Sequence, residues 1–191
     1  MRDFSSARRV QWLRQAYGCA GKLRDDTRGA AAIEFALLLP LMTLLFLGAV
    51  EMTDALNANR KTTAVASTVA DLAAQADALH DAGIADIFGA AQAVLAPFDS
   101  AGTEIILSSV SVRPDGMTRV DWSDAFGTAL PHAKDAILDV PDDIIMANGS
   151  VIVAEVAYPY ESPLSYFLIG EVILSDVFYA RPRLALTVPR I

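Results

Sequence analysis

The stretch Arg28–Val50 reads RGAAAIEFALLLPLMTLLFLGAV, and it decides how the chain is organised. From Ala30 to Val50 the only ionisable residue is Glu34. At a rise of about 1.5 Å per residue, a helix of this length reaches about 31 Å, which matches the hydrocarbon thickness of a bilayer. The stretch therefore predicts a transmembrane helix. The alternative is a buried helix in a soluble core, which the charge contrast between the flanks disfavours.

The two flanks of this helix carry opposite net charge. Residues 1–29 hold seven basic and three acidic side chains, a net charge of +4, so the rest of the −8 chain carries −12. Basic flanks of membrane spans stay in the cytoplasm. We therefore expect a basic cytoplasmic leader or tail at 1–29, a transmembrane segment at 30–50 and an exported domain at 51–191.

Two residues interrupt the apolar stretch. A carboxylate within a span costs a few kcal/mol on insertion scales, so Glu34 is expected to have a partner or a function. The alternative is that Glu34, close to Gly29, lies within reach of interfacial water. Pro40 has no N–H to donate and predicts a kink near the middle of the helix.

The residues around Gly29 resemble a known processing site. A basic leader ends in Gly29 and is followed by a small residue, Glu34 five positions after the glycine, Phe35 and a long apolar run. This order resembles the site at which prepilins and pseudopilins are cut. It is similar in particular to the TadE/TadG-like pseudopilin family of the tight-adherence (Flp-type) pilus assembly system. The resemblance covers Arg28 to about Asn59, with a weaker one over 174–183.

The resemblance implies a processing enzyme, partners and a location. A prepilin peptidase would cut between Gly29 and Ala30, and Glu34 with Phe35 would align subunits through the new terminal amine of a neighbour. The partners would be the inner membrane and other pilus assembly proteins or pilins. The N-terminus would be cytoplasmic and the C-terminal domain periplasmic. Two rivals stay open, namely an uncleaved anchor and an ordinary signal peptide.

The helical pattern continues beyond the apolar stretch. We predict one helix from about 32 to 79, in which Val65, Val69, Leu72, Ala76 and Leu79 form an apolar stripe. The stripe fits packing within the chain's own domain or against a partner helix, and we favour the former.

Shorter elements follow the long helix. His80–Gly83 predicts a break, and a short helix follows with an apolar face of Ile84, Ile87, Phe88, Ala91 and Leu95. Strands at 103–113 and 118–122 flank a Pro114–Gly116 turn and form a hairpin, with further strands at 151–158 and 175–188. A short helix is predicted at His132–Leu138. This order predicts an α+β fold, with helix packed on an antiparallel sheet of about four strands, the general plan of pilins.

The sequence carries no pattern typical of catalysis or cofactor binding. His80 and His132 lack metal-ligand spacing, and no nucleotide-binding, nucleophile or CxxC motif occurs. Asp139, Asp142 and Asp143 read as a solvated turn and not as a calcium loop. The acidic composition argues against nucleic acid binding, and the single Cys19 excludes a disulfide within the chain. We expect no catalytic residues, metal or cofactor.

These observations favour a structural role. We expect a non-enzymatic, membrane-anchored component of pilus assembly that acts by helix-mediated subunit association. The alternative is a membrane-tethered periplasmic enzyme or ligand-binding domain. A pocket with convergent polar groups and shifted pKa values would favour that alternative.

Overall fold

The computed structural model describes residues 29–141, 143–144, 149–162 and 172–191. The proposed leader at 1–28 and most of the apolar segment 163–174 lie outside the described residues. The chain divides into two units, Met1–Ala49 and Val50–Ile191. The first unit contains the start of the long helix, and the second contains everything that forms a core.

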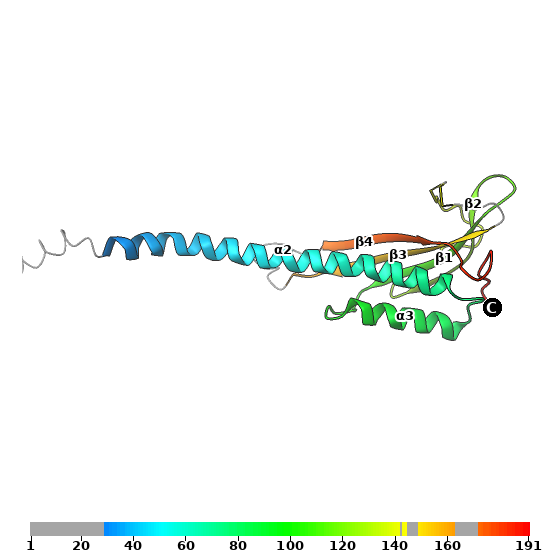
Figure 1. The fold of residues 1–191 in the computed structure, drawn as a ribbon, viewed down its shortest axis with the longest axis horizontal. Helices are drawn as coiled ribbons and strands as arrows, with labels where there is room; N and C mark the ends of the chain where they lie inside the picture. The colour runs from blue at the N-terminus through cyan, green and yellow to red at the C-terminus, as the bar shows by residue number, and fades with distance from the viewer. Residues whose placement is uncertain (1–28, 142, 145–148, 163–171) are drawn as a thin grey trace, which may run out of the picture. The chain divides into compact units, whose positions relative to one another are not determined.

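The described residues form two helices and one sheet (Figure 1). The helices are α2 (Ala30–Ala74) and α3 (Asp81–Leu95), and the strands are β1 (Glu104–Val112), β2 (Thr118–Phe126), β3 (Ser150–Tyr160) and β4 (Val172–Ala180). The sheet has the order β2-β1-β3-β4, and every neighbouring pair is antiparallel. The α+β class with an antiparallel sheet of four strands is confirmed.

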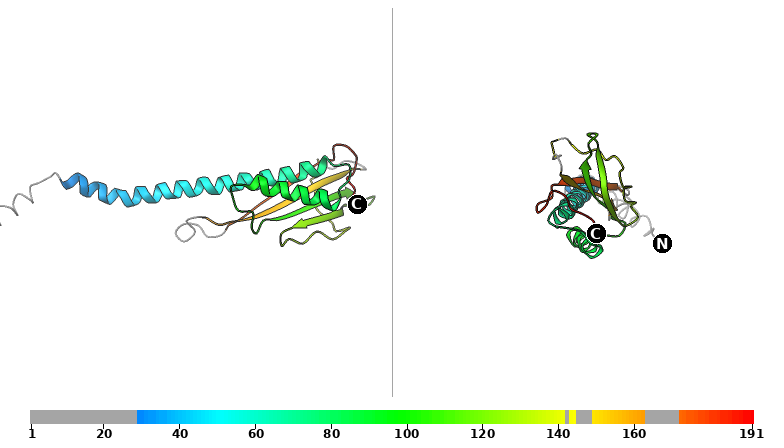
Figure 2. Two further views of the ribbon diagram at one scale, coloured as in Figure 1. Left: turned by 90° about the horizontal axis from the view of Figure 1, so that it is seen from below. Right: turned by 90° about the vertical axis from the view of Figure 1, so that its right-hand side faces the viewer.

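The larger core of the second unit lies between the helices and one face of the sheet. Figure 2 shows α3 and the C-terminal part of α2 end-on against the same face. From α2 it buries a face made mostly of small side chains, namely Ala58, Thr62, Val65, Ala66, Val69, Ala70, Ala73 and Ala74. The seven apolar residues of this face cluster with alternate residues of β3, from Ile152 to Tyr160. Because alanine side chains are small, the helix backbone can lie close to the sheet. The C-terminal half of α2 therefore packs within its own domain, as predicted.

The helix boundaries differ in detail from the prediction. α2 ends at Ala74 and not near 79, and Leu72 of the predicted stripe is 37% exposed. Leu79 lies in the connection between α2 and α3 and is buried. Its N–H donates a hydrogen bond to the carbonyl of Pro189 over 2.9 Å, which fixes this connection against the end of the chain. Gly83 does not break a helix, because it lies in the first turn of α3. The five apolar residues predicted for the α3 face are the five that are buried.

The predicted hairpin is confirmed, with one irregularity. Gly116 takes a φ of 78° in the turn, a conformation that glycine adopts at little cost. A β-bulge lies where Ser109 pairs with Trp122 and Val110 pairs with Val120. The extra residue turns Val120 to the face of the sheet opposite Trp122, so the two pack in different clusters.

The last third of the sequence holds two wrong predictions. No helix forms at His132–Leu138, which runs as an irregular segment with a single bridge between Ile137 and Arg119. Its apolar side chains instead cover the second face of the sheet, where Ala136 and Leu138 pack against Val110, Val120 and Val153. The last strand is β4, which ends before Pro182, and the residues after it are not strand. The proline cannot donate to the ladder.

Candidate functional site

The apolar start of α2 exposes hydrophobic side chains in every direction. Ile33, Phe35, Leu37 and Leu38 are each more than half exposed, although at about 100° per residue they point to different sides of the helix. The most apolar window of α2 has a mean hydropathy of 2.2 and no buried residue. A helix that is hydrophobic all round needs an apolar environment, and α2 is long and apolar enough to cross a membrane.

The predicted processing and alignment residues lie at the N-terminal end of this helix. Gly29 directly precedes α2, and a Cβ atom added to it would meet no atom within 4 Å. Ala30 is the first residue of the helix, and Glu34 and Phe35 follow in its first two turns. All four are exposed, and Glu34 has no ion pair or hydrogen bond among the described residues. No group within the described part of the chain therefore pairs with the only carboxylate of the stretch.

Pro40 lies inside α2, and the helix continues through it. Because proline has no N–H, the carbonyl of Ala36 loses its helical donor at this point. Nearby, the hydroxyl of Thr43 donates to the carbonyl of Leu39 over 2.8 Å. Such back-bonding by threonine often accompanies a bend in a helix.

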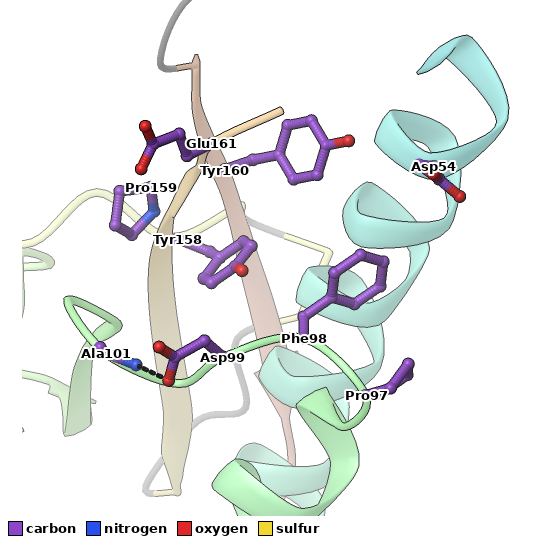
Figure 3. Close-up of a pocket in the computed structure, with 9 residues that line it drawn as sticks. All are labelled: Asp54, Pro97, Phe98, Asp99, Ala101, Tyr158, Pro159, Tyr160 and Glu161. Atoms are coloured by element: carbon purple, nitrogen blue, oxygen red, sulfur yellow. Dashed lines mark hydrogen bonds between the residues drawn. The ribbon is translucent and has the colours of Figure 1, made fainter. Parts of the chain in front are cut away.

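The second unit holds a pocket of about 560 Å³ between α2, the segment after α3 and the end of β3 (Figure 3). Phe98, Tyr158 and Tyr160 supply its aromatic wall, with the Phe98 ring 6.3 Å from that of Tyr160. Asp54 and Asp99 also line it. In Figure 3 both tyrosines extend from β3 toward Phe98 and α2.

The charged side chains that line the pocket are all acidic. Burial, and then the nearby charges of Glu51 and Asp54, raise the pKa of Tyr160. Burial and the charge of Asp99 likewise raise the pKa of Tyr158. None of the described residues that line the pocket is basic. The negative charge of the pocket is therefore not compensated from within its wall.

Two buried polar atoms have no hydrogen-bond partner within the described part of the chain, one on Tyr160, which lines the pocket, and one on Glu51, whose charge acts on Tyr160. Glu51 is 2% exposed and Tyr160 is 3% exposed. The Oε1 atom of Glu51 and the phenol oxygen of Tyr160 are both buried without a hydrogen bond within the described part of the chain. Buried polar atoms are rarely left unpaired, because each loses its bonds to water.

The pocket was not predicted from the sequence. Its residues come from three distant segments, and the only local signal is the pair of tyrosines at alternate positions of β3. Among the described lining residues there is no histidine, cysteine, serine or lysine that would form a nucleophile–base pair with a carboxylate. The described residues also contain no group of three or more His, Cys, Asp or Glu placed to hold a metal ion.

Comparison with known proteins finds a similarity to a protein family. Residues 29–71 match the model of a family described as TadE-like protein. The matched region begins at Gly29 and covers nearly the whole of α2, including Glu34 and Pro40. No curated protein and no solved structure gives a significant match.

Proposed function

Residues 29–71 are a TadE-like segment, and from this premise we propose that the protein is a membrane-anchored, pseudopilin-like component of Tad pilus assembly. It works without catalysis, by association of α2 with helices of other subunits. The observation that carries the proposal is a family match centred on a helix whose exposed apolar surface contains one carboxylate. The exported domain faces the periplasm and the basic N-terminus faces the cytoplasm.

Glu34 directs the association. Prepilin peptidase cuts between Gly29 and Ala30, and the new terminal ammonium of one subunit pairs with Glu34 of its neighbour. In a low-dielectric medium an unpaired carboxylate is costly, so the pairing favours one alignment of the two helices over others. Phe35 packs beside this contact, and a bend at Pro40 adjusts the direction of the helix beyond it.

The first test is the intact mass of the protein purified from its native membrane. Loss of residues 1–29 supports processing by the peptidase. A full-length mass would contradict it and leave a plain anchor. Fractionation of the same membranes with and without alkaline carbonate separates an integral protein from a peripheral one.

The second test addresses Glu34 alone. Glu34→Gln keeps the shape and removes the charge, so we expect normal membrane insertion but reduced recovery with other pilus components after crosslinking. Glu34→Asp keeps the charge and serves as the matched control. Equal recovery of wild type and the Gln variant would overturn the proposed role of the carboxylate.

A further inference from the structure

We propose that the pocket between Asp54, Phe98 and Tyr160 binds the primary ammonium group of a phosphatidylethanolamine headgroup. The proposal concerns the second unit and goes beyond helix association. It rests on the membrane-anchor part of the proposed function. A failure of the pilus role leaves it untouched, because headgroup binding is measured on the isolated chain in a bilayer.

The acidic lining of the pocket favours binding of a cation. Asp54, Asp99 and Glu161 line it, and Glu51 lies close enough to influence Tyr160. None of these four carboxylates forms an ion pair with any described residue. Asp99 and Glu161 are exposed, whereas Glu51 is buried and Asp54 is half-buried. A buried or half-buried carboxylate without a counter-charge is unfavourable, and a cation beside Glu51 and Asp54 would reduce that cost.

The aromatic wall favours an organic ammonium group over a metal ion, because the ammonium group loses less hydration free energy when it leaves water. Tyr158 and Tyr160 are both buried, and their rings lie 6.5 Å and 6.3 Å from the ring of Phe98. The faces of such rings attract an ammonium group, and the attraction grows as the cation is desolvated. A bare metal ion would lose more hydration than these neutral rings replace.

The unpartnered atoms select a primary ammonium over a quaternary one. The phenol oxygen of Tyr160 and Oε1 of Glu51 accept hydrogen bonds and have no donor among the described residues. An ethanolamine ammonium has three N–H donors, whereas a choline group has none. Hydrogen bonds that involve charged partners are about twice as strong as neutral ones.

The position of Asp54 in the sequence selects a lipid as the source. Asp54 follows Val50, the last residue of the apolar stretch, by four residues, which is about 6 Å along a helix. The headgroup layer extends about 5–8 Å beyond the hydrocarbon on each side of a bilayer. Tyrosines are also enriched at this level of membrane proteins. The carboxylates repel a purely anionic headgroup but accept the ammonium end of a zwitterionic one.

The test uses the full chain in nanodiscs that contain equal amounts of phosphatidylethanolamine and phosphatidylglycerol. The lipids that stay bound after gentle delipidation are counted by native mass spectrometry. We expect wild type to retain phosphatidylethanolamine with about tenfold preference, since one charged hydrogen bond supplies a factor of that size. Asp54→Asn and Tyr160→Phe should both bring the ratio close to that of the bulk lipid.

Two matched variants control for general effects. Asp86→Asn removes an exposed carboxylate of α3, and Tyr179→Phe removes a phenol that packs on the other face of the sheet. Both should keep the wild-type preference. A wild-type ratio equal to that of the bulk lipid would overturn the proposal, and so would an unchanged ratio in Asp54→Asn and Tyr160→Phe.

Two further arms test the identity of the headgroup. Replacing phosphatidylethanolamine with phosphatidylcholine should abolish the preference, and equal retention of the two would refute recognition through N–H donors. Adding N-acetyl-lysine amide tests a protein source of the same group. If the lysine derivative displaces the lipid at micromolar concentration, the natural ligand of the pocket is a lysine side chain of a partner protein, and the lipid assignment is wrong.

Discussion

Arg190 holds the carboxylate of Asp124 at two points. Its Nε donates to Oδ2 over 2.8 Å, and its Nη2 donates to Oδ1 over 3.3 Å. The same guanidinium donates to Asp81 at the start of α3 and to the carbonyl of Leu79. These carboxylates raise the pKa of Arg190 above its ordinary value. The penultimate residue therefore links the end of the chain to β2 and to the connection between the two helices.

Arg190→Ala should destabilise the second unit. The variant leaves the half-buried carboxylate of Asp124 without its donor, and a hydrogen bond to a charged group contributes about 2 kcal/mol. We expect the free energy of unfolding, from urea titrations of the full chain in detergent, to fall by about this amount. The matched control is Arg183→Ala, whose ion pair with Asp71 is exposed and should cost less than about 1 kcal/mol. Equal losses in the two variants would contradict the special role of Arg190.

Trp122→Phe should also destabilise the unit. The indole N–H of Trp122 donates to the carbonyl of Val188 over 2.7 Å, and Val188 is buried. Phenylalanine keeps an aromatic ring but leaves that carbonyl unpaired, at a cost of about 1–3 kcal/mol. The same urea titration measures the loss, followed by circular dichroism because the variant removes a tryptophan. An unfolding midpoint equal to that of wild type would show that the bond contributes nothing.

Much of the fold follows from local sequence patterns. The apolar face of α3 was predicted residue by residue, because a helix of two faces repeats its pattern every 3.6 residues. The hairpin was predicted because Pro114–Gly116 interrupts two β-branched runs. The apolar length of the stretch from Ala30 to Val50 predicted the membrane-span candidate in the same way.

The features that local patterns do not reveal depend on contacts between distant residues. Val120 and Trp122 alternate like neighbours on one face, but the bulge against Ser109 separates them, and no local residue signals it. The segment around Leu138 has helical residues, yet its carbonyls and amides bond to the edge of β2 at Thr118 and Val120. Tertiary hydrogen bonds here outweigh a weak helical preference.

The pocket also escaped prediction for this reason. Asp54, Asp99 and Tyr160 are separated by more than forty residues in sequence and meet only after the helices pack on the sheet. The proposed site at Gly29 and Glu34, by contrast, is a continuous stretch and is predicted from its residue order alone. Its role in assembly stays a prediction.

Val65→Ala and Leu72→Ala should show which part of the predicted stripe of α2 is buried in its own domain. Val65 is buried, whereas Leu72 is 37% exposed. Removing two methyl groups and leaving a cavity costs about 2 kcal/mol at Val65. The larger truncation at Leu72 should cost less than about 1 kcal/mol, because that side chain is already partly in water. Urea unfolding of both variants gives the comparison, and a greater loss at Leu72 would contradict its assignment as the exposed member of the stripe.

Acid should weaken the link between Arg190 and Asp81. The hydrogen bond and charge of Arg190 hold the pKa of Asp81 below its ordinary value of 3.8. The unfolded chain therefore binds this proton more readily than the folded chain. The stabilisation is fully present above about pH 4 and is lost as the pH falls through the lower pKa of the folded state. Asp81→Asn removes this titration, so its free energy of unfolding should fall less steeply than that of wild type below pH 4.

Urea midpoints at several pH values between 7 and 2.5 measure the slopes, with Asp86→Asn of the same helix as the control. Parallel curves for wild type and Asp81→Asn would show that the carboxylate of Asp81 does not depend on Arg190 in solution.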